Sequence, residues 1–495
     1  MVRDQNTMGR TCVYANMKVQ VLIISSILTL LGLCSCNHED DFSRSPNDLL
    51  SFSVDSVKLD TVFSNIPSSV SSFWVYNYSG KDIRCTSVRL ERGNQTGFRV
   101  NVDGVYLGQE VGFQASDIEI RKQDSIRVYV ELTSPYGYTD AVREIHDRII
   151  FTLESGKEQK VGLNALSWDG IVLKDFHISK DTTFSGEKPI IIYGGLTVDS
   201  ARILTIAPGT TLYFHHDAGI DVYGRLIAEG SADKNIVLRG SRFDRMFDYL
   251  PYNRVSGQWR GIRFRGSSYD NLLTYADIHG ACDGVVLDSA DVARQTLTIT
   301  ASNIHNCQGY GLLVRYARIG LFNSLFSNAL NDCVAIQGGY ATINGCTVAQ
   351  FYPFDSKRGV ALRLGSRENS VHRFECINTI VTGYADDELM RVPGDETREL
   401  NFLFDHCLLR TPRELTADSI RFAHVVYEAV RDTAHAGYKN FINIDQDSLK
   451  YDFHLAPRSL AIDKANTATA LAADRSGRRR DAKPDIGAYE YIKEE

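Results

Sequence analysis

The most regular pattern of apolar and polar positions is a short run in which a small residue precedes two apolar residues separated by one position. Side chains alternate between the two faces of a strand, so those two apolar residues share a face. The pattern predicts successive strands whose shared face is buried: Ile262 and Phe264, Val285 and Leu287, Leu312 and Val314, Val334 and Ile336, Val360 and Leu362, each pair preceded by Gly261, Gly284, Gly311, Cys333 or Gly359.

A second pattern gives the length of the repeat. A small or amide side chain stands two positions before a branched apolar one at 276, 302, 323, 346, 378 and 407, with spacings of 21–32 residues. That length is typical of one coil of a three-sided parallel β-helix, whose coils must stack to bury their apolar faces. No segment of helical period separates the runs, which excludes a parallel α/β fold. Residues 169–413 are therefore predicted to form a parallel β-helix.

Residues 51–168 have a different texture. Short runs alternate apolar and polar positions, as at Val100 and Val102 or Ile126 and Val128, with Gly, Asn and Asp between the runs. This pattern predicts an antiparallel β-sandwich. The stretch from Asp60 to Gly80 resembles the opening of small immunoglobulin-like spacer domains of bacterial surface proteins. Cys85 is the only cysteine in this region, which excludes the immunoglobulin disulfide.

The N-terminus predicts export. The apolar run 19–33 follows Met17-Lys18, so residues 1–35 are expected to be a signal peptide with Met17 as the start. Leu33-Cys34-Ser35-Cys36 resembles the bacterial lipobox, which implies that Cys36 carries lipid. The following Asn37-His38-Glu39-Asp40-Asp41 resembles the export signal of Bacteroidota lipoproteins, which implies an outer-membrane lipoprotein that faces the cell exterior. Residues 36–50 are expected to be an acidic, polar tether.

The coils resemble the right-handed β-helices of the pectin-lyase-like superfamily. The run from Gly257 to Phe264 is similar to the core of a Bacteroidota lipoprotein group in that superfamily, and Pro484-Asp485-Ile486-Gly487-Ala488-Tyr489-Glu490 is similar to its closing segment. The resemblance implies an all-β chain, with a right-handed parallel β-helix preceded by the immunoglobulin-like sandwich. Residues 414–495 are expected to close and cap the open end, whose unpaired edge would otherwise be exposed.

Charge and cysteine content narrow the possible partners. A formal net charge of −7 and a pI near 6.0 argue against nucleic acid, which requires a concentrated basic surface. Of ten cysteines, Cys12 and Cys34 are lost on cleavage and Cys36 is acylated, which leaves an odd number that cannot all pair.

Catalytic signatures are weak. The superfamily's lyases need Ca²⁺ held by carboxylates with an Arg or Lys base, and its hydrolases need converging carboxylates. Asp386-Asp387 stands without the other hydrolase motifs, and the lyase motif is absent. His279 and His406 lie several coils apart, too far for shared ligation. We therefore expect no metal or cofactor, except Ca²⁺ if the chain is a lyase.

Two features could bind a ligand. The position after each predicted ladder run gives an outward polar row of Arg265, Asp288, Arg315, Gln337 and Arg363, which could follow an anionic glycan. The insert 241–254 is rich in Arg and aromatic residues, including Tyr249, Tyr252 and Arg254, and is expected near this row. Beside the row runs an apolar outward stripe, Val286, Leu313, Ala335 and Ala361, which should be covered by the insert, the C-terminal segment, the sandwich or a ligand.

Three functions remain open from the sequence. The first is a cell-surface lipoprotein whose β-helix flank binds glycan or another envelope component without catalysis, anchored in outer-membrane lipid through Cys36. The second is a polysaccharide lyase or glycoside hydrolase that acts on acidic polysaccharide. The third is a structural or adhesin-like protein that binds protein partners.

Overall fold

The computed structural model describes residues 42–493 except 417 and 433, so the predicted signal peptide and Cys36 lie outside the described residues. The chain divides into two compact units. One holds the described residues 42–57, 70–131 and 146–164, and the other holds 58–69, 132–145 and 165–493. No helix among the described residues is long and apolar enough to cross a membrane.

The strands before Asp169 form two antiparallel sheets, as the alternating pattern predicts. The rings of Phe52 and Phe151, one from each sheet, lie 5.2 Å apart, so the sheets pack face to face. The first sheet has the order β1 (Ser51–Phe52), β3 (Ser71–Asn77), β9 (Asp124–Leu132), β5 (Phe98–Val102) and β6 (Val105–Tyr106). The second has β2 (Ser56–Phe63), β11 (Glu158–Trp168), β10 (Arg143–Leu153), β4 (Ile83–Leu90) and β7 (Gln114–Ala115), with β8 (Ile118–Ile120) also beside β4 and the 3-10 turn η1 (Gln109–Val111) between β6 and β7.

Residues 42–50 are not the free tether expected from their polarity. Phe42 is buried, and the Arg84 guanidinium lies 3.8 Å from its ring centroid. Gln159 bonds both the N–H and the C=O of Leu50. The sandwich therefore begins close to Phe42, because an apolar residue at each end of this short segment packs against it.

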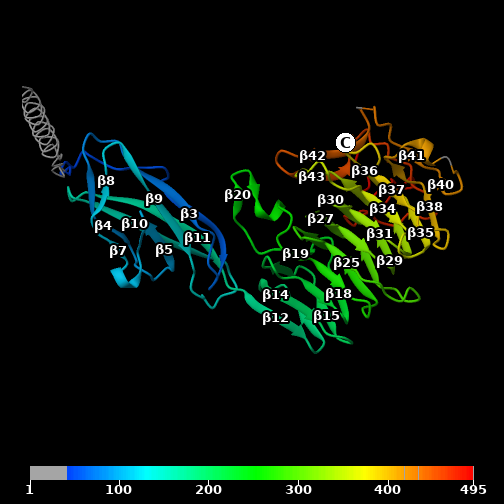
Figure 1. The fold of residues 1–495 in the computed structure, drawn as a ribbon, viewed down its shortest axis with the longest axis horizontal. Coiled ribbons are helices and arrows are strands. Elements are labelled where there is room, and N and C mark those ends of the chain that lie inside the picture. The colour runs from blue at the N-terminus through cyan, green and yellow to red at the C-terminus, as the bar shows by residue number, and fades with distance from the viewer. Residues whose placement is uncertain (1–41, 417, 433, 494–495) are drawn as a thin grey trace, which may run out of the picture. The chain divides into compact units, whose positions relative to one another are not determined.

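From Ile171 onward the strands stack as parallel ladders on three faces, which Figure 1 shows in green to orange. The long strands β12 (Ile171–Ile178) and β14 (Ile190–Val198) each run along both of the first two faces. Face 1 continues with β16 (Thr211–Phe214), β19 (Ile236–Gly240), β24 (Ala276–His279), β27 (Asn303–Cys307), β30 (Leu325–Ala329), β33 (Thr347–Gln350), β36 (Ile380–Gly383), β39 (Leu408–Leu409) and β41 (Val426–Tyr427).

The other two faces follow in chain order within each coil, and the stack is a parallel β-helix. Face 2 has β17 (Ile220–Val222), β22 (Ile262–Phe264), β25 (Val285–Leu287), β28 (Leu312–Val314), β31 (Val334–Ile336), β34 (Leu362–Gly365) and β37 (Leu389–Val392). Face 3 has β13 (Thr182–Phe184), β15 (Ile203–Ile206), β18 (Arg225–Glu229), β23 (Asn271–Thr274), β26 (Leu297–Thr300), β29 (Ala317–Phe322), β32 (Gly339–Asn344), β35 (Val371–Ile377), β38 (Leu400–Asp405) and β40 (Phe422–Ala423).

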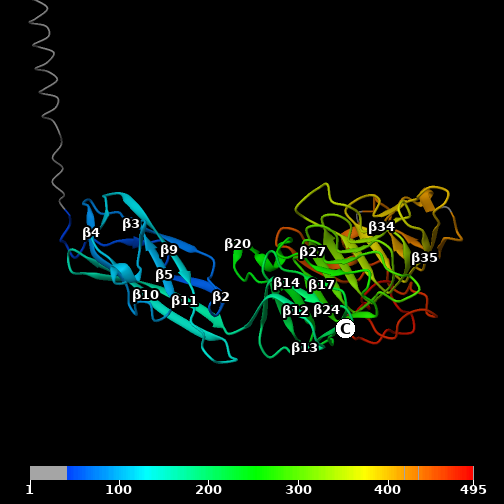
Figure 2. The ribbon, with the colours of Figure 1, turned by 60° about the horizontal axis from the view of Figure 1, so that its bottom comes forward.

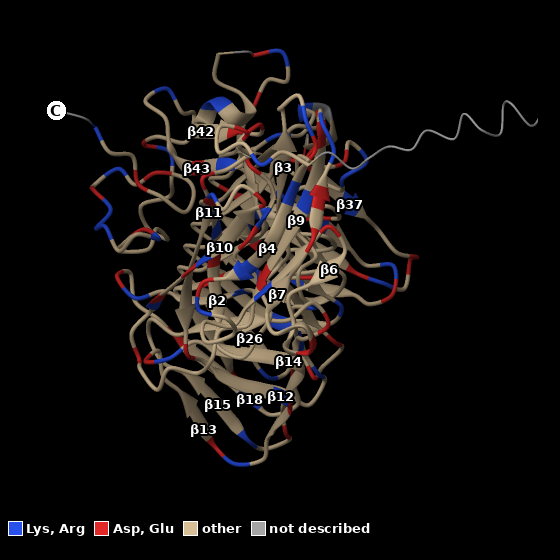
Figure 3. Ribbon diagram, turned by 90° about the vertical axis from the view of Figure 1, so that its left-hand side faces the viewer, with Lys and Arg blue, Asp and Glu red and all other residues tan. Residues whose placement is uncertain are grey.

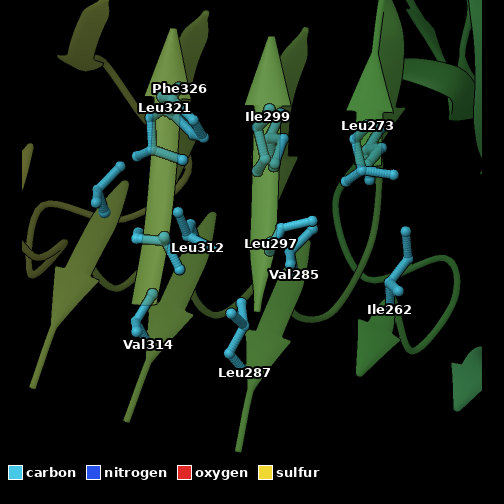
Figure 4. Close-up of a cluster of buried hydrophobic side chains, with 14 of the residues drawn as sticks. Ile262, Leu273, Val285, Leu287, Leu297, Ile299, Leu312, Val314, Leu321 and Phe326 are labelled. Atoms are coloured by element: carbon cyan, nitrogen blue, oxygen red, sulfur yellow. The ribbon is translucent and has the colours of Figure 1, made fainter. Parts of the chain in front are cut away.

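The predicted apolar ladder on face 2 is confirmed through Ile336. Leu312 pairs with Val285 on one side and Val334 on the other, and all three side chains are fully buried. Figure 4 shows Val285 and Leu312 pointing into the core beside Leu297 and Leu321 of face 3. Many of the turns carry charged residues, and most of the strand segments are tan (Figure 3).

The ladder departs from the prediction in the next coil. Leu362 pairs with Val334 and Leu364 with Ile336, so these two leucines point inward and Val360 precedes the strand. The predicted pair of Val360 and Leu362 is therefore wrong by two positions. The longer turn before β34 shifts the register, and Ala361 rather than Gly359 stands next to the strand.

The corner that leads into face 1 has left-handed backbone in successive coils. It is occupied by Tyr275, Ala301, Asn323, Gly345, Asn378, His406 and His424, with φ of 46–64°. Asn and Gly adopt this region most readily. Asn323 and Asn378 therefore occupy the corner, and the inward small side chains of those coils are Ser324 and Thr379, one residue later than the sequence pattern indicated.

The insert and the C-terminal segment both cover the outer surface of face 1. The insert contains the hairpin β20 (Arg245–Phe247) and β21 (Leu250–Pro251) and the turn η2 (Tyr252–Arg254). β20 projects from the stack in Figures 1 and 2. Phe243, which precedes the hairpin, lies 5.3 Å from the ring of Tyr213 on β16.

The C-terminal segment follows the turns η3 (Arg413–Thr416) and η4 (Gly437–Asn440) and contains β42 (Phe441–Asp445) and β43 (Lys450–Leu455). The sequence predicted that this segment caps the end of the stack, but much of it lies elsewhere. Its apolar residues pack on the outward side chains of β30, β33, β36 and β39. Gly487 N–H donates to Asn378 O at 2.9 Å, and Ala488 N–H donates to Thr347 Oγ1 at 3.1 Å. The closing motif therefore lies along the flank, where Leu325 and Ile380 would otherwise be exposed.

Candidate functional site

The predicted polar row contains a cluster of arginines around one carboxylate. Arg265 follows β22, Asp288 follows β25 and Arg315 follows β28, so three successive strands of face 2 hold them. Arg315 Nη1 lies 2.9 Å and Arg265 Nη1 3.4 Å from Asp288. Arg263, on β22 itself, donates to both carboxylate oxygens through Nε and Nη2 at 2.8–3.1 Å. The structure thus brings Arg265, Asp288 and Arg315 together as predicted and adds Arg263.

The cluster carries excess positive charge and remains accessible. Burial raises the pKa of Asp288, but hydrogen bonds from Arg263 and the charges of all three arginines outweigh it, and the pKa stays below its ordinary value. The carboxylate is therefore ionised at neutral pH. Arg265 also pairs with Asp221 at 2.6 Å, and Arg260 approaches that aspartate at 3.5 Å. The side chains of Arg263, Arg265 and Arg315 are 40%, 29% and 42% exposed.

The remaining members of the row differ in position. Gln337 is half-buried and follows β31, in line with Arg315, as predicted. Arg363 is paired with Ala335 and opposes no member of the row, because of the register shift in β34. It makes a two-point ion pair with the buried Asp332 at 2.6 and 2.9 Å. Arg363 therefore lies next to Ala335 in the outward stripe beside the row, where the sequence predicted Ala361.

The apolar stripe is covered from within its own coils. Val286, Leu313 and Ala335 form a small buried cluster, and Leu313 is only 8% exposed. Tyr310, in the turn before β28, packs against this cluster. Among the described contacts, a neighbouring tyrosine shields the stripe, rather than the insert or the C-terminal segment.

The insert residues do not join this row. Arg254 donates to Ser448 O at 2.7 Å in the C-terminal segment, and the Arg242 guanidinium lies 3.4 Å from the Tyr252 ring centroid. Tyr249 is 63% exposed and stacks on Phe247. These contacts place the insert over face 1, not face 2. Tyr223 is the aromatic residue that lies over an arginine of the row, with its ring centroid 5.5 Å from the Arg265 guanidinium.

A second cluster lies on the outer side of face 1 and was not predicted. His279 Nδ1 lies 2.6 Å and His305 Nε2 3.2 Å from Asp277 Oδ1. The two imidazole rings stack at 4.9 Å. Burial lowers the pKa of His279, so its ring is neutral at neutral pH. The signal in the sequence is Asp277-x-His279 followed one coil later by Asn303-x-His305. His279 is therefore a neighbour of His305 on the adjacent coil, and not of the distant His406.

Two further groups combine histidine with aspartate. His406 Nδ1 and His424 Nδ1 lie 2.8 and 2.9 Å from Asp405 Oδ1 at the corner of the last coils. His215, His216 and Asp217 lie together in an exposed turn. Beside the Asp405 group, at the end of the stack, lies a cavity of about 720 Å³ that is lined by Arg413, Thr416, Ser419, Phe422, His424, Val425 and Tyr427.

Comparisons with known proteins support the fold. Residues 169–348 match the family model described as a right handed beta helix region, so the parallel coils have that hand. No curated protein matches the chain.

Three solved structures show weak similarity to the chain. One is the VesB protease of Vibrio cholerae, with 13% identity over 25% of this chain and 32% of that chain and a TM-score of 0.17. A second is a PapD-like domain of human CEP192, with 11% identity, 26% and 90% coverage and a TM-score of 0.17. A third is the catalytic unit of a GH87 alpha-1,3-glucanase from Streptomyces thermodiastaticus strain HF3-3, with 12% identity, 68% and 79% coverage and a TM-score of 0.28. The chain spans about a third of the VesB structure, and none of these scores establishes a relationship.

Proposed function

We propose that this protein is a cell-surface β-helix that binds an acidic glycan along face 2 without catalysis. The observation that supports this most is the arginine cluster around Asp288. Four arginines, Arg260, Arg263, Arg265 and Arg315, pair with two aspartates, Asp221 and Asp288. Asp283 also acts on Arg263, and the arginines still outnumber these three carboxylates. A partly exposed arginine fork with spare N–H donors suits a carboxylate ligand.

The spacing of the cluster favours an extended ligand. Arg265 and Arg315 follow strands two coils apart, which corresponds to about 10 Å at a strand spacing of about 4.8 Å. Arg263 and Asp288 fill the space between them. A chain of carboxylate-bearing sugars lying along the stack would meet positive charge on successive coils, and Tyr223 offers a 40% exposed ring at one end.

The state of the carboxylates favours binding over hydrolysis. A glycoside hydrolase needs a carboxylic acid that holds a proton for the leaving group. Asp288 is instead held ionised by three arginines, which lowers its pKa. Asp221 is engaged by Arg265 and Arg260. Neither carboxylate of the cluster is therefore suited to act as the general acid.

Replacing Arg265 and Arg315 together with glutamine should weaken binding of a polyuronate such as polygalacturonate. We expect a loss of roughly tenfold or more, since each charge-assisted hydrogen bond contributes about 1.5–3 kcal/mol. Binding to the parent should also weaken as salt is raised. The measurement is calorimetric titration with polygalacturonate and with a neutral galactan.

The matched control is Arg373→Gln, which removes a 66% exposed arginine from face 3. It should bind the polyuronate as the parent does. Equal binding by the double variant and the parent, or equal affinity of the parent for the neutral galactan, would exclude face 2 as an acidic-glycan site.

Surface display in this proposal rests on lipidation of Cys36, which lies outside the described residues. Replacing Cys36 with alanine should leave the precursor uncleaved by the lipoprotein signal peptidase and unlabelled by a fatty-acid probe. Protease treatment of intact cells should degrade the parent but spare the variant. Full fatty-acid labelling of the Cys36→Ala protein would contradict this assignment.

A further inference from the structure

The Asp277 cluster on face 1 has the composition and convergence of a metal site. Its three ligand atoms, a carboxylate oxygen, Nδ1 of His279 and Nε2 of His305, all lie within 4.8 Å of one another. We propose that Asp277, His279 and His305 bind one divalent transition-metal ion of the Zn²⁺ class. Imidazole with carboxylate suits Zn²⁺ and its neighbours, whereas Ca²⁺ and Mg²⁺ prefer oxygen alone.

The distances fit such an ion with small side-chain movements. Zn²⁺ takes nitrogen at about 2.0–2.1 Å and carboxylate oxygen at about 2.0–2.2 Å. Ligand atoms around it must therefore stand somewhat over 3 Å apart. His305 Nε2 already lies 3.2 Å from Asp277 Oδ1, while His279 Nδ1, at 2.6 Å, must move outward by a fraction of an ångström. Both rings aim a nitrogen at the same oxygen of Asp277. An ion placed among these atoms would take the place of the hydrogens between them, and each neutral ring would then carry its proton on its other nitrogen.

The backbone around the cluster is held firmly. His279 and His305 are register partners on β24 and β27, so the sheet ladder itself sets their separation. Trp259, which is fully buried, donates Nε1–H to His279 O at 2.9 Å. A site built on regular strands keeps its ligands in place before the ion arrives, which reduces the cost of ordering them.

An unsatisfied neighbour independently indicates a missing partner. Asn303 is the register partner of Asp277, and its Oδ1 is buried with no hydrogen-bond partner among the described residues. A buried oxygen of this kind is costly unless something pairs with it. An ion, or a water molecule bound to it, beside Asp277 would satisfy that oxygen.

One cation lies near the cluster, and its N–H donors bond backbone oxygens outside the cluster. Arg239 precedes the insert, and its guanidinium donates to Gly240 O at 3.1 Å and to Arg242 O at 2.8 Å. It also lies over the rings of Tyr213 and Phe243. These contacts hold the guanidinium toward the insert. Arg239 therefore does not occupy the space in which the three ligand atoms would meet an ion.

The other two histidine groups are less well built. The second oxygen of Asp405 already accepts from Asn466 Nδ2 at 3.2 Å, and His424 is 70% exposed at a corner. His215 and His216 are adjacent in an exposed turn. The Asp405 group therefore provides a matched control, with the same residue types in a looser setting.

Equilibrium dialysis of the purified full-length chain against Zn²⁺ tests the proposal. We expect saturable binding that His279→Gln and His305→Gln each weaken at least tenfold, while His424→Gln leaves it unchanged. Ca²⁺ at the same concentration should not compete. Zn²⁺ should also raise the melting temperature of the parent more than that of either variant, because only the folded parent assembles all three ligands.

Several results would overturn the site. They are binding that survives both variants, binding that His424→Gln abolishes instead, or displacement of Zn²⁺ by equal Ca²⁺. If the variants fail to fold, anomalous scattering at the zinc edge from crystals of the parent still locates the bound ion. A peak between Asp277, His279 and His305 supports the proposal, and a Zn²⁺-soaked crystal with its peak elsewhere or with no peak refutes it. Because the cluster lies on face 1, its failure leaves the glycan proposal for face 2 unaffected.

Discussion

Replacing Leu312 with aspartate should unfold several coils of the β-helix. Leu312 is fully buried between Val285 and Val334 in the interior ladder of face 2. A buried carboxylate without a partner costs several kcal/mol, and the loss of a leucine from a packed core costs about 2–5 kcal/mol more. That sum is comparable to the whole stability of an ordinary domain. Each coil depends on its neighbours, so the defect should spread along the stack.

The measurement is thermal unfolding by circular dichroism together with hydrogen exchange of β25, β28 and β31. The control is Met390→Asp, which places the same charge in face 2 at an outward, 40% exposed position. We expect the control to melt within a few degrees of the parent. A Leu312→Asp protein that melts with the parent would mean that the ladder does not face the core.

Replacing Arg480 with methionine should detach the closing motif from the flank. Arg480 Nη1 pairs with Glu490 at 2.9 Å, and both side chains are nearly fully buried. Its other donors reach Asp485 O at 3.0 Å, Gly487 O at 2.6 Å and Asn323 Oδ1 at 3.3 Å. Removing one partner of a buried ion pair typically costs about 3–5 kcal/mol, because the remaining charge is left without compensation.

Hydrogen exchange should show the loss of protection over residues 437–493 in the Arg480→Met protein before the coils themselves unfold. Adding Glu490→Gln should recover part of the stability, since it removes the unpaired charge. The exposed Arg479→Met is the control and should behave as the parent. If Arg480→Met leaves the C-terminal segment as protected as in the parent, the ion pair does not hold it in place.

Local patterns predicted the fold where the small marker residue stands directly before the strand, as Gly284 stands before Val285. The runs from Ile262 to Ile336 gave the correct inward residues, because strand alternation is a local property. The prediction slipped at Val360, where a longer turn moved the strand by two positions and Gly359 was a false marker. Asn378 and Asn323 misled in a similar way, because their side chains suit the left-handed corner rather than the inward column.

Contacts between distant segments were harder to predict. The insert carrying Tyr249 lies in the sequence between strands of faces 1 and 2, and nothing local decides which face it covers. Tyr213 and Phe243 decide it by packing on face 1. The closing motif likewise follows the last coil in sequence, yet Leu325 and Ile380 draw it back along the flank. His279 and His305 needed the register between coils before they could be recognised as neighbours.

Hydrogen exchange of the parent with and without a polyuronate would test most directly whether face 2 binds acidic glycan. Binding at the Arg265, Asp288 and Arg315 cluster should slow exchange in β22, β25 and β28 and in the turns that follow them, with little change on face 3 or in the insert. Protection confined to the insert or the end of the stack, or no protection at a saturating polyuronate concentration, would contradict the proposed site.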